Sequence, residues 1–442
     1  MLIRVGRSMG TSLLVAICKF AALPVLAYAI QPVDFGVYAL ITSMLSFGSA
    51  FLGLGVRHYT YRMVPGRPIQ EALRLMNTST LFELASASLI LAATLPTGLA
   101  DTVLRALNVD HHRTAFGLAT LWLLVDLVAI NLRNFLLARE RTGDANIVDL
   151  LRQVGWMPLA LAAWVMFGRL EVHSAVVVLV ISSLLSSAAG VAYAAMVLRA
   201  SAMFEFSVHL ASLRPALRYS LPLLLPVVAT PLMRLADRGV IAASRSLEEL
   251  AAFTLLTAGA GALYGASALS VEAALLPKAV RAANLGRLGR SRSILWAIVT
   301  ISLLTFILGA AVIAFAIFAI GRDVYPQYEG AFSLFPIVCG GYLLMIASRA
   351  PHNALLLAGR TRVLAMIDAG ALLVALAVDL ALVPRLGISG AVLASIAAFG
   401  VGGALKMVMS RAWNDLSLRE VVVPLSILRD EDSGGFTAPN TV

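Results

Sequence analysis

The sequence predicts an all-α polytopic membrane protein of about twelve transmembrane helices, in two pseudo-symmetric six-helix bundles with both termini in the cytoplasm. Three observations predict this fold: the apolar composition, the distribution of Lys and Arg among the loops, and an internal repeat. Of the 442 residues, 60% are hydrophobic and 13% are charged, against about 25% charged in a typical soluble domain. Helices of about 20 apolar residues tolerate a bilayer because they satisfy their own backbone hydrogen bonds.

Hydropathy along the chain predicts twelve spans joined by short loops. They cover residues 8–30, 35–56, 79–100, 115–138, 146–168, 173–198, 219–242, 249–273, 294–320, 331–349, 362–384 and 387–409. The long apolar runs exclude a transmembrane β-barrel, whose strands are short and alternate in polarity. The first run is longer than the apolar core of a signal peptide and carries Lys19, so we interpret it as a retained helix.

The placement of positive charge predicts the orientation of these spans. With a cytoplasmic N-terminus, 24 of the 34 Lys and Arg residues lie at cytoplasmic ends and loops, six in outer loops and four within spans. This fourfold excess agrees with the positive-inside rule. It explains the net charge of +10 without a nucleic-acid partner, and it indicates a multi-pass membrane protein.

An internal repeat divides the spans into two equal sets. At an offset of 215, residues 34–42 align with residues 249–257, and at an offset of 219, residues 134–149 align with residues 353–368. Six helices per copy give both copies the same orientation, with a cavity between the bundles. We therefore expect an N-terminal bundle (1–200), a cytoplasmic linker between bundles (201–218), a C-terminal bundle (219–410) and a cytoplasmic tail (411–442).

Several short segments resemble a known family, the Wzx-like polysaccharide exporters of bacteria. The matching segments are Phe35–Leu40, Gly53–Val56 with Tyr61–Arg62, Tyr219–Pro222 with Ala236–Arg238, and Leu382–Ala391. The resemblance extends over residues 5–410 and includes the wider superfamily of multidrug and toxin extruders and the lipid II flippase. It implies the extruder-like fold of that superfamily and a flippase that moves undecaprenyl-pyrophosphate-linked oligosaccharide to the periplasmic leaflet by alternating access. Such a role serves polysaccharide or lipopolysaccharide biosynthesis and would allow a polysaccharide polymerase as a partner.

Charged residues inside the predicted spans are the candidate site. A charge at the bilayer centre costs about 2.5 to 3.5 kcal/mol on insertion scales, so each should face a cavity or a partner. The 215-residue offset aligns Lys19 with Arg234, and two cations facing one central space would suit a pyrophosphate. We predict Lys19, Arg234 and Arg238 as cavity residues. Alternatively, Arg234 pairs with Asp237, Lys19 bonds a carbonyl or an acid such as Asp126, and Arg238 forms an ion pair or gate contact with Asp237.

Acidic and polar residues in the spans supply the remaining candidates. Asp126, Asp237 and Asp379 are predicted to couple transport to protons or to form ion pairs. The repeated polar residues Asn134, Arg141, Asn353 and Arg360 are either gating residues or turn and capping residues. Glu83 and Glu272 are expected to be solvated.

Two other functions remain open: an ion-coupled multidrug extruder of the same superfamily, and a membrane-embedded glycan polymerase or ligase. Such an enzyme usually needs a large outer loop, and the longest one here, about residues 101–114, offers only Asp110, His111 and His112. Adjacent histidines lack the spacing for a metal site on one helix face, and no nucleotide-binding motif appears. We therefore predict no catalytic residue, metal or cofactor.

Overall fold

The computed structural model describes residue 18 and residues 25–53, 56–64, 67–94, 97–139, 141–167, 172–200 and 210–410, and these contain helices and no strand. The helices before residue 201 are α2 (Pro32–Leu52), α3 (Val56–Met63), α4 (Ile69–Thr94), α5 (Leu99–Ala106), α6 (Arg113–Ala138), α7 (Thr142–Val154), α8 (Trp156–Phe167) and α9 (Val172–Ala200). Those after it are α10 (Leu213–Ser244), α11 (Leu247–Tyr264), α12 (Ser270–Asn284), α13 (Leu288–Ala316), α14 (Arg322–Val324), α15 (Glu329–Phe332), α16 (Phe335–Ala347), α17 (Arg349–Leu357), α18 (Thr361–Leu386) and α19 (Ile388–Met409).

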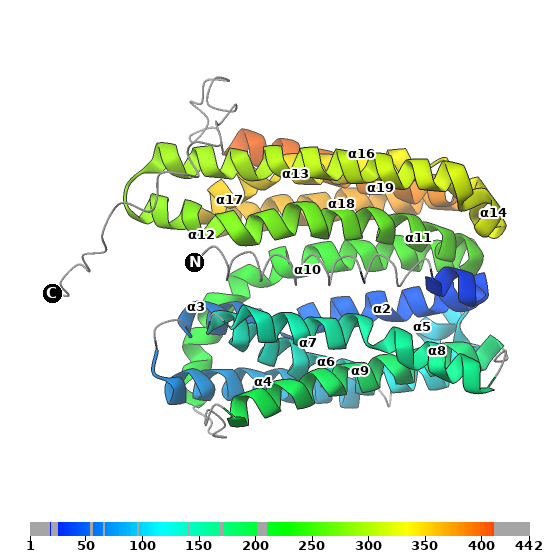
Figure 1. Cartoon of the computed structure of the whole chain (residues 1–442), viewed down its shortest axis with the longest axis horizontal. Coiled ribbons are helices and arrows are strands. Elements are labelled where there is room, and N and C mark those ends of the chain that lie inside the picture. The colour runs from blue at the N-terminus through cyan, green and yellow to red at the C-terminus, as the bar shows by residue number, and fades with distance from the viewer. Residues whose placement is uncertain are drawn as a thin grey trace.

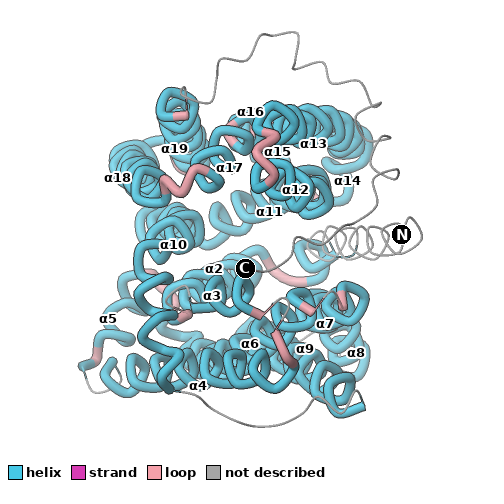
Figure 2. Tube along the Cα trace, turned by 90° about the vertical axis from the view of Figure 1, so that its left-hand side faces the viewer, coloured by secondary structure: helices cyan, strands magenta, loops and turns pink. Residues whose placement is uncertain are grey.

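These helices pack as two layers, which we call the first bundle (α2–α9) and the second bundle (α10–α19). Figure 1 shows the long helices of both bundles running in nearly the same direction. Helix α2 of the first bundle and helix α10 of the second lie where the two layers meet. Figure 2, viewed along the helices, separates the two groups and places α10 beside α2. The main contacts between the bundles join α2 to α10 and α11, and α3 to α10. The end where α2 and α11 begin is called the outer end, following the predicted orientation.

Eight helices in the described residues are long and apolar enough to cross a membrane, and a ninth span is possible if a pair bent by 53° counts as one. The bent pair, Pro326–Phe332 and Phe335–Leu357, covers the predicted span 331–349. The predicted span 146–168 is divided at Gly155 into α7 and α8, and span 219–242 lies within the charged helix α10. The predicted span 8–30 falls mostly outside the described residues. Twelve spans therefore stay a prediction.

The two copies of the sequence repeat form equivalent elements. Helices α2 and α11 begin at Pro32 and Leu247, 215 positions apart, and they pack against each other. The second pair of aligned segments, residues 134–149 and 353–368, forms the same turn in each bundle. Arg141 N–H donates to the Leu136 carbonyl at 2.8 Å before α7, and Arg360 N–H to the Leu355 carbonyl at 2.9 Å before α18. The repeat thus specifies helix starts and turns in both bundles.

The turn between α18 and α19 depends on two glycines of the segment Leu382–Ala391. Gly387 has φ 58° and ψ −135°, a conformation that is essentially restricted to glycine. A β-carbon on Gly390 would lie 2.7 Å from the Leu382 carbonyl oxygen, so only glycine lets the two helices approach this closely. This hairpin forms the wall of the second bundle against which α10 packs.

Candidate functional site

The bundles meet closely at the outer end. Gly36 of α2 lies so near the Leu247 carbonyl of α11 that a β-carbon would overlap with its oxygen. Close to this contact, the ring of Tyr28 meets Tyr325 edge to face, with centroids 6.3 Å apart. The residues of α2 from Phe35 to Ile41 are buried in the same core cluster as α11. The space between the bundles is therefore closed at this end.

Arg238 crosses the boundary between the bundles. From α10 of the second bundle, its guanidinium donates to the Ala39 carbonyl of α2 at 3.1 Å and also to the Ser43 hydroxyl. Ala39 is 2% exposed and Ser43 is 3% exposed, so these bonds are shielded from solvent. From the sequence, we expected Arg238 either to line the cavity or to form an ion pair or gate contact with Asp237. The structure gives Arg238 partners in the opposite bundle, and no ion pair with Asp237 is found in the described part of the chain.

Arg234 lies one helical turn from Arg238 on the same face of α10, because residues four apart are neighbours on a helix. Unlike Arg238, it is exposed, and among the described residues it has no hydrogen bond or ion pair. Within the described part of the chain it is therefore a cation without an ion-pair partner, beside the closed outer end and on the side toward the inner end. Its predicted counterpart, Lys19, lies outside the described residues.

Asp237 points into the second bundle, toward Asp379 of α18 and Ser395 of α19. The Ser395 hydroxyl donates to one Asp237 oxygen at 3.1 Å, and the carboxyl groups of Asp237 and Asp379 are within hydrogen-bonding reach of each other. Asp379 is fully buried, and neither of its oxygens has a protein donor in the described regions. The structure thus assembles two carboxyl groups and one hydroxyl from three helices.

Asp126 belongs to a separate network within the first bundle. Arg152 of α7 donates to Asp126 at 3.0 Å and to Asp149 at 3.3 Å, and Arg133 pairs with Asp149 at 2.8 Å. Ser187 of α9 also donates to Asp126 at 3.2 Å. The charges of this network balance, so Asp126 has a structural counterion.

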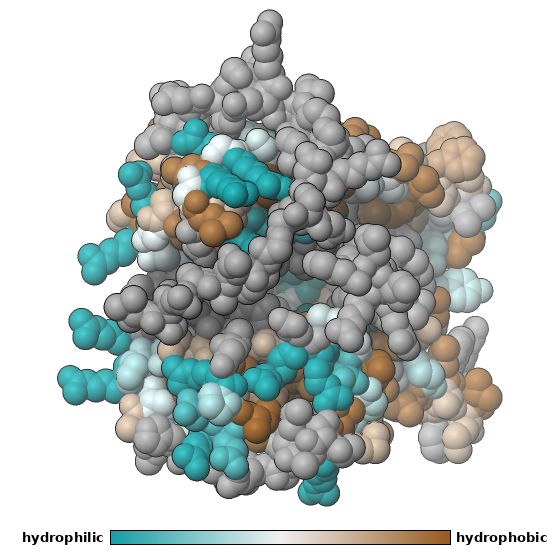
Figure 3. All heavy atoms as spheres, turned by 60° about the vertical axis from the view of Figure 1, so that its left-hand side comes forward, coloured by the Kyte–Doolittle hydropathy of each residue, from teal (hydrophilic) through white to brown (hydrophobic). Residues whose placement is uncertain are grey.

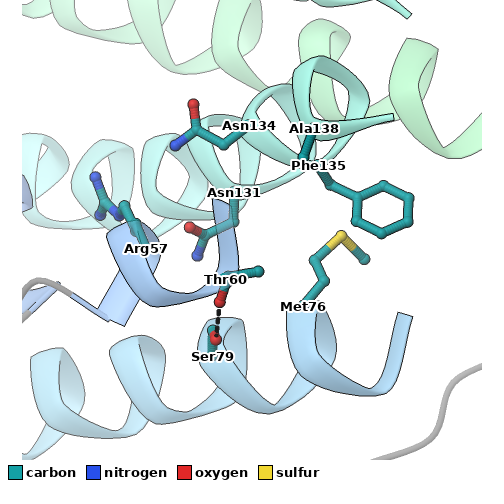
Figure 4. Close-up of a pocket in the computed structure, with 8 residues that line it drawn as sticks. All are labelled: Arg57, Thr60, Met76, Ser79, Asn131, Asn134, Phe135 and Ala138. Carbon is teal, nitrogen blue, oxygen red and sulfur yellow. Dashed lines mark hydrogen bonds between the residues drawn. The ribbon is translucent and has the colours of Figure 1, made fainter. Parts of the chain in front are cut away.

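A buried ion pair links α3, α4 and α6 within the first bundle. Glu83 of α4 is fully buried and accepts from Arg57 Nε at 3.0 Å and from the Asn131 amide at 2.9 Å. Figure 4 shows Arg57 and Asn131 at a small pocket in which Thr60 bonds Ser79 at 2.6 Å. The expectation that Glu83 is solvated is wrong, because arginine and amide donors replace its water.

The second bundle repeats this arrangement. Glu272 of α12 is 8% exposed and accepts from Arg349 Nε at 2.7 Å and from the Asn353 amide at 3.2 Å. The expected solvation of Glu272 is therefore also wrong. One sequence signal could have indicated these clusters: Arg57 and Glu272 occupy equivalent positions of the repeat, 215 residues apart, at the ends of apolar runs. Each bundle thus contains a cluster of one glutamate, one arginine and one asparagine.

The four predicted gating residues have local contacts. Asn134 accepts from Arg133 at 3.0 Å, and Arg141 pairs with Asp144 at 2.7 Å in the first turn of α7. Asn353 belongs to the Glu272 cluster, and Arg360 is an exposed residue that precedes α18. Arg141 and Arg360 lie at the turns before α7 and α18, whereas Asn353 bonds a residue of another helix; a gating role for the four residues stays a prediction.

Hydrophilic side chains gather at the inner end. Figure 3 shows them on both halves of the molecule, on either side of a recess. The two bundles are thus in contact at the outer end and polar at the inner end. Helix α10, which lies where they meet, carries Arg234, Asp237 and Arg238.

Solved structures of membrane transporters have the same fold. The lipid II flippase MurJ in an inward closed conformation aligns with a TM-score of 0.70 at 11% identity, covering 94% of this chain and 88% of that one. An inward-facing multidrug resistance MATE transporter of the MOP superfamily gives 0.65 at 14% identity, with 90% and 94% covered. The outward-facing form of a MATE transporter gives 0.56 at 14% identity, with 94% and 96% covered. The chain therefore has the fold of these proteins, and its long apolar helices make it a multi-pass membrane protein.

Sequence comparison identifies the family. The model of the polysaccharide biosynthesis protein family matches residues 5–283, so the chain belongs to that family. No curated protein is similar enough in sequence to be matched to it.

Proposed function

We propose that this protein is a flippase that carries undecaprenyl-pyrophosphate-linked oligosaccharide from the cytoplasmic to the periplasmic leaflet of the bacterial inner membrane. Family membership supports a substrate related to polysaccharide synthesis. The superfamily fold supports transport by alternating access between the two bundles. A glycan and pyrophosphate cannot cross hydrocarbon directly, so the polar head group would pass between the bundles while the lipid tail stays in the bilayer.

The observation that carries this proposal is the exposed Arg234 on the helix between the bundles, which has no hydrogen bond or ion pair among the described residues. A guanidinium binds phosphate oxygens through two parallel hydrogen bonds, and such charge-assisted bonds are strong where water is excluded. Arg234 would hold the pyrophosphate beside the outer closure, with Lys19 as a second cation. A carrier of cationic drugs would have less use for a free cation here, which favours the lipid-linked anion over the extruder alternative.

The pair Asp237 and Asp379 is the proposed coupling site. Two carboxyl groups in contact repel each other when both are ionised, so a shared proton relieves the repulsion. Both residues are buried and lie on helices that pack against each other, α10 and α18. Loss or gain of that proton would change the packing of α10, the helix that also carries Arg234.

Flipping of a fluorescent undecaprenyl-pyrophosphate oligosaccharide in proteoliposomes tests the function. Wild type should flip the lipid, and Arg234→Ala and Lys19→Ala should each slow it. Arg218→Ala removes another exposed arginine of α10, nearer the inner end, and should flip at the wild-type rate. Folded wild-type protein that moves a cationic dye but none of several lipid-linked glycans would be an extruder, and the flippase proposal would fail.

A further inference from the structure

We infer that Arg238 is a latch, meaning a residue whose contacts hold the outer end closed, and that its partners are the Ala39 carbonyl and the Ser43 hydroxyl. This inference concerns the conformational change and does not depend on which substrate is carried. It also gives Arg238 a role different from that of Arg234, although the two arginines lie on one face of α10.

The contact of Arg238 lies on the boundary between the bundles. Arg238 belongs to α10 and its partners to α2, so the bonds join the bundles across their boundary. Opening the outer end must separate α2 from α10 and α11, and these bonds must then break. A contact within one bundle, such as Arg152 with Asp126, would survive the same movement.

The acceptors of Arg238 are already oriented within α2. The Ala39 carbonyl accepts from the Thr42 and Ser43 hydroxyls at 2.9 and 2.7 Å. Because the Ser43 hydroxyl donates its proton there, its oxygen lone pairs are left to accept from Arg238. Hydrogen bonds with a charged donor are stronger than those between neutral groups. The acceptors are neutral, so the latch can release without leaving a buried carboxylate behind, as it would if Arg238 bonded an acid.

The packing near Arg238 also depends on the two bundles being close together. At Gly36, α2 approaches α11 at backbone distance, and Tyr28 contacts Tyr325 near the same end. These contacts fit only when the two bundles are close together. Arg238 is a polar contact of this closure, and the preceding residue, Asp237, contacts Ser395 in the second bundle. A shift of α10 at Asp237 would therefore also displace the latch.

The experiment measures opening of the outer end directly, without substrate. Ala251 is fully buried in the second turn of α11, so a cysteine there reacts only when the outer end opens. The parent is Ala251→Cys with Cys18→Ser and Cys339→Ser, reconstituted in nanodiscs and labelled with a hydrophilic maleimide. Arg238→Gln should raise the labelling rate about tenfold, and Ser43→Ala by a smaller factor of about three, as expected for one lost hydrogen bond.

If Arg238→Gln folds poorly, Ser43→Ala and Arg238→Lys decide the result, with Arg218→Gln as the control. Arg238→Lys keeps the charge but loses the planar donor group, and should give a rate between those of the parent and Arg238→Gln. Arg218→Gln, on the exposed inner part of the same helix, should label like the parent. Parent-like labelling of Ser43→Ala and Arg238→Lys would overturn the latch. Because no lipid-linked glycan is present, failure of the flippase proposal would not affect this measurement.

Discussion

Gly36 of α2 packs directly on the carbonyl oxygen of Leu247 at the start of α11, and no β-carbon fits between the two helices. The two helices are the equivalent copies of the repeat and belong to different bundles. A single glycine therefore sets how closely the bundles approach at the outer end.

Replacing this glycine should weaken the closure. Gly36→Ala places a methyl group against a backbone oxygen that cannot rotate away, and overpacking of this kind costs about 1 to 3 kcal/mol. We expect a lower melting temperature and faster labelling of Ala251→Cys. Gly117→Ala is the matched control, because the added β-carbon has no atom within 4 Å. It should leave the melting temperature at or above the wild-type value and the labelling rate unchanged. Equal melting temperatures for the two variants would contradict the close approach.

The buried glutamate clusters should be strong determinants of stability. Glu83→Gln leaves the Arg57 guanidinium buried without its counterion, and breaking such a pair costs about 3 to 5 kcal/mol. The corresponding change in the second bundle, Glu272→Gln, should destabilise similarly because of Arg349. Thermal unfolding in detergent measures both.

The control for these variants is an exposed ion pair. Glu71 lies 3.7 Å from Arg67, with its side chain 56% exposed, and pairs of this type contribute about 0 to 1 kcal/mol. Glu71→Gln should therefore unfold near the wild-type temperature. If Glu83→Gln did the same, Glu83 would be solvated, as its position near a span end first suggested.

Asp379 and Asp126 should respond differently to neutralisation. Asp379→Asn removes a proton-exchanging carboxyl group without breaking an ion pair, so we expect a folded protein whose flipping no longer responds to an imposed pH gradient. Asp126→Asn weakens the Arg152 network, so we expect a lower melting temperature with the gradient response retained. Flipping assays at matched incorporation, with and without the gradient, compare the two. If a sodium gradient drove Asp379-dependent flipping at constant pH, the coupling ion would be sodium and the proposal of proton coupling would fail.

The turn before α19 should require glycine. Gly387→Ala forces an alanine into a backbone conformation with φ 58° and ψ −135°, a strain of about 1 to 3 kcal/mol, and adds a β-carbon near the Arg245 and Glu249 side chains. We expect a lower melting temperature than for Gly370→Ala, since a β-carbon at Gly370 in α18 meets nothing within 4 Å. A stable Gly387→Ala variant would show that the turn can adopt another geometry.

Hydropathy and repeat patterns predicted much of this architecture because they depend on local sequence. A span is recognised from about 20 consecutive residues, and the repeat fixed equivalent helix starts at Pro32 and Leu247. The break at Gly155 was not predicted. It depends on Ser186 of α9, whose hydroxyl donates to the Leu151 carbonyl, a contact between residues 35 positions apart.

The sequence by itself determined that this chain is helical, multi-pass and built from two related halves, and it indicated which spans contain charges. Only the tertiary structure decided what those charges contact. Asp237 and Arg238 are adjacent in sequence, yet one faces Ser395 in its own bundle and the other faces Ala39 in the opposite bundle. The reason is that successive residues point about 100° apart around a helix, so the helices packed on each side of α10 choose the partners.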